Sequence, residues 1–213
     1  MKQTIGVFLL CLAASGILVA QAGDPGETRS VAQAGKARGQ QAAESDLAPL
    51  DPQQEKCALQ IFLTSVQKQI VSAAEAMPAD KYGFAPTEGE FKGVRSFGQQ
   101  VKHLAATNHI LAAAALGEEA PADAGDETGP EAIRTKAEIL DYLNSSFAHL
   151  GRAIDAIGAR SIAVKSSPIS PLPASAATRL ALTVEALIHA FDHYGQMVEY
   201  LRMNGVVPPP SRP

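Results

Sequence analysis

The chain of 213 residues contains no tryptophan and only two cysteines. Cys11 lies in an N-terminal apolar run, so Cys57 is the one cysteine in the part of the chain that is expected to fold. A single cysteine can form neither an intramolecular disulfide nor a cysteine-based metal cluster. We interpret Cys57 as a small buried apolar residue, with a reactive thiol as the second interpretation.

Positive charge is not concentrated anywhere along the sequence. There are 18 Lys and Arg against 22 Asp and Glu, which gives a formal charge of −4, and there is no basic run. Proteins that bind nucleic acids need a basic patch, because contacts to phosphate supply much of their affinity. We therefore expect no nucleic-acid partner, and the sequence gives equally little support for binding to a membrane surface.

Residues 1–22 have the order of a secretory signal peptide. Lys2 precedes an apolar run, and Ala20-Gln21-Ala22 forms a small-x-small cleavage pattern. The run is shorter than the roughly 18 to 20 apolar residues of a membrane span, although an uncleaved anchor stays open as an alternative. We expect cleavage and export to the bacterial periplasm or medium, with no membrane attachment after processing.

Residues 23–50 are small and polar, which predicts a flexible linker before a folded domain at residues 51–210. The domain contains no alternating strand pattern and no internal repeat. Its first segment has apolar side chains at helical spacing, namely Phe62, Val66, Ile70, Ala73 and Met77. Pro78 ends this helix, and a second helix begins near Ser96 with Gln99 in the capping-box position.

A third helix is expected at about residues 131–157 and a fourth at about residues 174–204. Between the second and third helices, residues 117–130 are acidic, and we interpret them as a solvated connection rather than a cation site. Prolines between the third and fourth helices predict a loop. Four amphipathic helices bury their apolar faces most simply as an all-α, antiparallel four-helix bundle.

The strongest functional pattern is a pair of histidines, His189 and His193, spaced by one helical turn. Residues at i and i+4 share one face of a helix, so both imidazoles could bind one metal ion. His103 on the second helix is the candidate third ligand. Three nitrogen ligands would leave a coordination position open, which is typical of catalytic rather than structural zinc sites.

A helical projection of the fourth helix places its large apolar residues roughly opposite His189: Leu180, Val184, Leu187, Phe191 and Val198. This predicts that the histidine pair lies off the main apolar stripe, at the border between core and solvent. His103 has a similar position on the second helix.

Several residues near this pattern have two interpretations. A zinc protease is excluded because Ala190, not glutamate, follows His189. Asp192 and Glu185 are either partners of the imidazole N–H groups or ordinary solvated charges. His109 and His149 are interpreted as surface or capping histidines, and Gly195 as a point where a neighbouring helix approaches closely.

Three motifs in this order resemble the DinB-like superfamily of bacterial four-helix metal-binding proteins: residues 77–86 (MPADKYGFAP), 96–103 (SFGQQVKH) and 189–196 (HAFDHYGQ). The likeness runs from about residue 54 to residue 209. It implies His103, His189 and His193 as metal ligands, with zinc or nickel as the most expected divalent metal. Characterised members include thiol S-transferases and a thiol-dependent isomerase, which implies a small-molecule substrate, possibly a thiol.

Two classes of function follow. The first is an exported metal-dependent transferase or hydrolase that acts on a small molecule, with a metal-activated water or thiol as the nucleophile. The second is a non-catalytic helical bundle that binds a metal or a small ligand. A homodimer is plausible from the resemblance, because related bundles pair through their helices.

Overall fold

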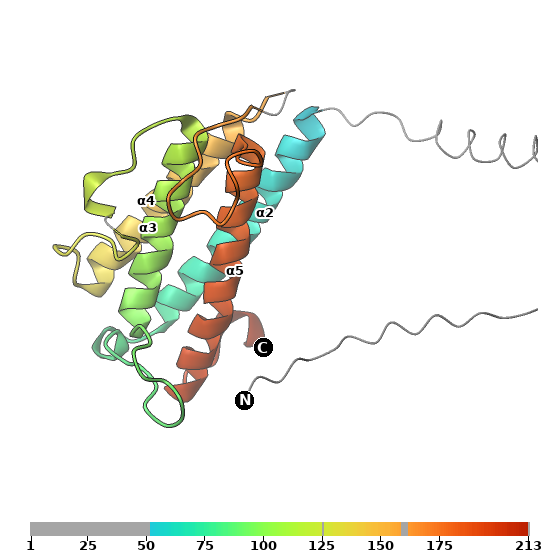
Figure 1. The fold of residues 1–213 in the computed structure, drawn as a ribbon. Coiled ribbons are helices and arrows are strands. Elements are labelled where there is room, and N and C mark those ends of the chain that lie inside the picture. Colours follow the sequence, from blue (N-terminus) through green and yellow to red (C-terminus); the bar gives the residue numbers. More distant parts are fainter. Residues whose placement is uncertain (1–51, 125, 159–161, 213) are drawn as a thin grey trace, which may run out of the picture. The chain divides into compact units, whose positions relative to one another are not determined.

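The computed structural model describes residues 52–124, 126–158 and 162–212 (Figure 1). These described residues belong to one compact unit. The expected signal peptide at residues 1–22 and the expected linker at residues 23–50 lie outside the described residues.

The described part of the chain forms four long helices and no strand. The helices are α2 (Pro52–Ala76), α3 (Phe97–Leu116), α4 (Lys136–Asp155) and α5 (Arg179–Met203), with short 3-10 turns η1 (Ala79–Lys81), η2 (Ala122–Ala124) and η3 (Pro209–Ser211). An isolated β-bridge joins Ala163 and Thr178. The predicted all-α four-helix bundle is confirmed.

Neighbouring helices in the bundle run in both relative directions (Figure 1). α2 is antiparallel to α4, because Lys136 at the start of α4 contacts the end of α2 at Met77. α3 is antiparallel to α5, and Arg179 at the start of α5 contacts Ala115 near the end of α3. α3 and α4 run parallel and so depart from the antiparallel order expected of neighbouring helices, because residues 117–135 return the chain to the starting end of α3. This crossover brings the acidic loop back alongside α3.

Local signals set where the helices begin. Ser96 and Gln99 form the predicted capping box of α3, with both reciprocal hydrogen bonds present. The predicted start of the third helix near residue 131 is wrong, because a second capping box at Thr135 and Glu138 starts α4 at Lys136. The fourth helix also begins later than predicted, at Arg179, with Thr178 as its N-cap.

The apolar core lies between the four helices and corrects two expectations about α2. Val66, Ile70 and Met77 are buried as predicted. Phe62 is 58% exposed, however, and Cys57 is exposed as well. Among the described elements α2 packs mainly against α4 and α5 and also contacts η3, and its outer face, with these side chains, stays exposed.

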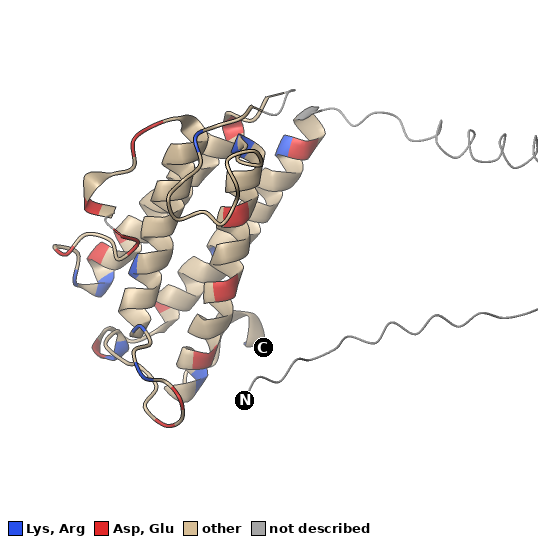
Figure 2. Ribbon diagram, in the orientation of Figure 1, with Lys and Arg blue, Asp and Glu red and all other residues tan. Residues whose placement is uncertain are grey.

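Acidic side chains follow one line along α5, at Glu185, Asp192 and Glu199, where Figure 2 shows acidic positions spaced along that helix. Their seven-residue spacing keeps them on one face of α5. None of the described helices is both long enough and apolar enough to cross a bilayer.

Candidate metal centre

The structure brings His103 of α3 together with His189 and His193 of α5. The Nε2 atom of His189 lies 3.2 Å from Nε2 of His103 and 2.9 Å from Nε2 of His193. The ligand atoms of all three residues lie within 4.8 Å of one another. The three residues predicted from the sequence therefore form one cluster, to which no other His, Cys, Asp or Glu of the described residues belongs.

The cluster lies deeper than predicted. His103 is 3% and His193 is 7% exposed, whereas Phe191, assigned to the apolar stripe of the fourth helix, is 45% exposed. The core-facing side of α5 instead includes Ala186 and Ala190, which are fully buried between the large buried residues Leu182, Leu187, Met197 and Leu201. The small side chains of Ala186 and Ala190 leave room between α3 and α5, and the imidazoles occupy this room in place of large apolar side chains.

Glu127 fixes the orientation of the His103 ring. Its backbone carbonyl lies 2.8 Å from Nδ1 of His103, and its carboxylate lies 3.7 Å from the same atom. A carbonyl oxygen only accepts hydrogen bonds, so Nδ1 carries the hydrogen and Nε2 presents its lone pair to the other two histidines. The acidic loop therefore does more than connect two helices. No side-chain pattern in the sequence indicates this role, because the shorter contact to His103 uses the backbone carbonyl of Glu127.

All three imidazoles are held in the neutral form. Burial lowers the pKa of His189 to about 3 and that of His193 to about 4, and repulsion from neighbouring histidines adds to the effect. Burial also lowers the pKa of His103, against the opposing effect of Glu127. Neutral imidazole is the form that binds metals, because the ring nitrogen must offer a lone pair.

The donor set fits a divalent transition metal. Metal–nitrogen distances of about 2.0 to 2.1 Å in tetrahedral geometry place neighbouring nitrogens about 3.3 to 3.4 Å apart. Two of the observed separations, 2.9 and 3.2 Å, are close to this value, and all three ligand atoms lie within 4.8 Å of one another. With their hydrogens on Nδ1, all three rings would offer Nε2 to such an ion, and the lowered pKa values disfavour an added proton in its place. Three protein ligands also leave at least one coordination position open.

Residues 63–197 match the family profile of the DinB superfamily. The chain belongs to the DinB superfamily. The matched range includes all three histidines, and the resemblance seen in the sequence motifs is confirmed. A search of curated proteins gave no match.

Polar residues surround the histidine centre of this DinB-superfamily protein. Gln100 Nε2 donates to Gln196 Oε1 at 2.7 Å, which joins α3 and α5 one turn away from His103 and His193. Asp192 accepts from Gln196 at 3.0 Å, and Glu185 accepts from Ser170 at 2.6 Å. These bonds, rather than contacts to imidazole, engage the two carboxylates that were candidates for orienting the histidines.

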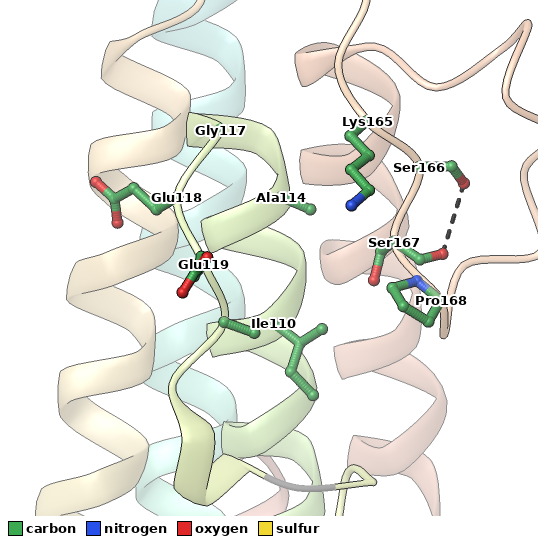
Figure 3. A pocket seen from close by; sticks show the side chains of 10 residues that line it. Ile110, Ala114, Gly117, Glu118, Glu119, Lys165, Ser166, Ser167 and Pro168 are labelled. Atoms are coloured by element: carbon green, nitrogen blue, oxygen red, sulfur yellow. Dashed lines mark hydrogen bonds between the residues drawn. The ribbon is translucent and has the colours of Figure 1, made fainter.

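A cavity of about 370 Å³ lies farther along α3, between that helix and residues 165–168 (Figure 3). Ile110 and Ala114 form its apolar wall, and the amine of Lys165 points toward α3 from the opposite side. None of the three histidines lines this cavity. Ala106, Ile110 and Ala124 form a small apolar cluster in the same region of α3.

Two other interpretations from the sequence are corrected. His149 is only 9% exposed and contacts His109, so these residues are not isolated surface or capping histidines. Gly195 is exposed, and no atom outside its own segment lies within 4 Å of the position that a Cβ would occupy. It therefore does not mark a close helix approach.

Proposed function

We propose that this DinB-superfamily protein is a divalent-metal-dependent enzyme that uses His103, His189 and His193 as ligands and acts on a small molecule by transfer or hydrolysis. The convergence of three neutral imidazole nitrogens, 2.9 and 3.2 Å apart, is the observation that supports the proposal. Zinc and nickel both suit an all-imidazole donor set. A divalent ion held there would supply Lewis acidity and lower the pKa of a coordinated water or thiol.

The surrounding residues have distinct tasks in this proposal. Glu127 keeps the hydrogen of His103 on Nδ1, so Nε2 stays available as a ligand. The Gln100–Gln196 hydrogen bond holds α3 and α5 at a fixed separation beside the centre. No protein nucleophile is required, because the activated water or thiol serves as one.

Arg95 favours an anionic partner. Burial is the main cause of the lowered pKa of His103, His189 and His193, and the positive charge of Arg95 lowers the pKa of all three further. Arg95 is exposed, and no carboxylate of the described residues lies within salt-bridge distance of it. A cation beside an open metal position attracts a thiolate or carboxylate group. Thiol substrates, which the family resemblance implies, fit this electrostatic environment.

Metal content tests the ligand assignment. The protein is purified without a histidine tag, loaded with zinc or nickel, and analysed by mass spectrometry. We expect His189→Ala and His193→Ala each to lose one tightly bound ion per chain, with helical content unchanged by circular dichroism. Gln196→Ala is the matched control, because Gln196 lies beside the centre but is not a ligand. Equal metal content in all variants would overturn the assignment.

Catalysis needs a separate test, because a three-histidine centre also suits a non-catalytic metal-binding bundle. Metal-loaded protein would be screened with thiols, esters and amides, and the same reactions repeated with His103→Ala. An enzyme is supported if the metal-loaded protein turns over one of these substrates while the metal-free protein and His103→Ala do not. Stoichiometric metal binding without turnover on any of these classes supports the binding protein instead.

Export is also proposed, on the composition of residues 1–22 alone. Outside the cytoplasm the low-molecular-weight thiols used by cytoplasmic relatives are scarce, so water or another ligand would be the nucleophile there. The intact mass of the protein recovered from a bacterial periplasm tests this step. A mass that corresponds to a chain beginning at Gly23 supports cleavage, and a full-length chain in the cytoplasm contradicts export.

A further inference from the structure

A second histidine cluster lies between α3 and α4, on a different face of α3 from His103. Nδ1 of His109 and Nδ1 of His149 are 3.0 Å apart. The two residues lie 40 positions apart in the sequence, and the rings are tilted by 52° with centroids 5.3 Å apart. The separation of these nitrogens resembles that between the ligand atoms of the first centre.

The partner of His149 places its hydrogen away from His109. Nε2 of His149 lies 3.2 Å from a carboxylate oxygen of Glu118. Glu118 turns away from the cavity and toward α4 (Figure 3), where Arg152 also donates to it at 3.4 Å. A carboxylate accepts and does not donate, so Nε2 of His149 carries the hydrogen. In the neutral ring, Nδ1 then has only a lone pair.

The partner of His109 leads to the same arrangement. Nε2 of His109 lies 3.2 Å from Oγ of Ser145, whose hydroxyl donates to the backbone carbonyl of Tyr142 at 2.8 Å. The single hydroxyl hydrogen is used by the carbonyl, so Oγ accepts from Nε2 of His109. Nδ1 of His109 therefore also presents a lone pair, directly opposite that of His149.

Two facing lone pairs need a cation between them. We infer that His109 and His149 bind a second divalent transition-metal ion through their Nδ1 atoms, with Glu118 and Ser145 orienting the rings from the opposite nitrogens. A carboxylate bonded to the far nitrogen of a ligating histidine is a common arrangement at metal centres, because it fixes the tautomer and raises the basicity of the ligand.

The surroundings suit a positive ion. Burial is the main cause of a His109 pKa of about 4, while the nearby Asp123 carboxylate opposes this lowering and also acts on Tyr142. The Asp123 carboxylate therefore supplies negative charge near the pair, and water would fill the remaining coordination positions. The site offers two imidazoles instead of three, so its affinity is lower than that of the first centre. Its exposed neighbours Ser145, Asp123 and Glu118 leave a path for the ion.

Zinc titration of the untagged protein with His109→Gln and His103→Ala tests the inference. We expect two zinc ions per unchanged chain, one in each single variant and none in the double variant, with circular dichroism as the check of folding. If His109→Gln fails to fold, Glu118→Gln is used in its place. We expect this variant to raise the dissociation constant of the weaker site about 10- to 100-fold and to leave that of the stronger site unchanged.

The outcomes separate the two centres. One ion that is lost in His103→Ala and retained in His109→Gln overturns the second site. The contact between His109 and His149 is then a hydrogen bond between the two rings, with the Ser145 hydroxyl turned toward His109. One ion that is lost in His109→Gln and retained in His103→Ala supports the second site and overturns the proposed three-histidine centre. No bound zinc overturns both.

Discussion

Nε2 of His103 and Nε2 of His189 lie 3.2 Å apart, although 86 positions separate the two residues in the sequence. The contact joins α3 to α5, so the histidine cluster exists only when these helices are packed. Loss of packing between α3 and α5 would therefore remove the metal site before it removed the helices. Conversely, an ion bound only by the folded chain stabilises that packing.

The metal-free protein should lose stability in acid. The unfolded chain binds protons at His189 and His193 near pH 6.5, whereas the folded chain binds them only near pH 3 and 4. The unfolded state therefore holds more protons between about pH 4 and 6.5, so the free energy of unfolding rises with pH there. Each histidine contributes a slope of up to about 1.4 kcal/mol per pH unit.

Urea unfolding in EDTA at pH 5 and pH 7 measures this slope. The double variant His189→Gln, His193→Gln should show a smaller difference between the two pH values. Part of the difference in the free energy of unfolding should remain in this variant, because burial also lowers the pKa of His103, His109 and His149. A free energy of unfolding that is equal at pH 5 and pH 7 in the unchanged protein would contradict the prediction.

Two helical glycines should respond in opposite directions to alanine. A Cβ on Gly98 would lie 3.1 Å from the Tyr82 ring and 3.2 Å from the Tyr82 carbonyl oxygen, and that carbonyl also accepts the Gly98 N–H. Gly98→Ala should therefore lower the free energy of unfolding by about 1 to 3 kcal/mol. Gly195 has open space around it, so Gly195→Ala should raise stability by about 0.5 to 1 kcal/mol. Thermal unfolding of both variants compares them, and equal shifts would argue against the packing at Gly98.

Lys136 should stabilise the end of α2. Its Nζ donates to the carbonyl oxygens of Glu75 and Met77 at 2.7 and 2.8 Å. Carbonyl groups at the end of a helix have no partner within the helix, so Lys136 satisfies them. Lys136→Met should lower the free energy of unfolding by about 1 to 2 kcal/mol. Lys68→Met, at an exposed position within α2, is the control. The prediction is wrong if chemical denaturation gives the same small change for both variants.

Arg95 should affect anion affinity and not metal retention. With cobalt in the first centre, binding of a thiol is followed by its sulfur-to-metal absorption band. Arg95→Gln should weaken binding of the anionic thiol mercaptoacetate by up to about 5-fold, because an exposed charge pair contributes about 0.2 to 1 kcal/mol. The neutral thiol 2-mercaptoethanol is the control and should bind unchanged. Parallel weakening of both thiols would indicate a structural effect at the centre instead of charge attraction.

The sequence by itself determined the fold class, the family and the three metal-ligand candidates. Local patterns carry these features: apolar residues at helical spacing, a capping box at Ser96, and two histidines one turn apart. The capping box that starts α4 at Thr135 was also present in the sequence, but the preceding acidic and proline-containing segment obscured it.

The tertiary structure alone decided which side of each helix is buried and which distant groups meet. On α5, Leu187 is buried as predicted, but Leu180 and Phe191 are exposed, because the inward face includes Ala186 and Ala190. The backbone contact of Glu127 with His103 and the pairing of His109 with His149 likewise depend on the parallel return of α4 along α3. Helical periodicity is a local property of the chain, whereas these contacts arise from how the helices are packed.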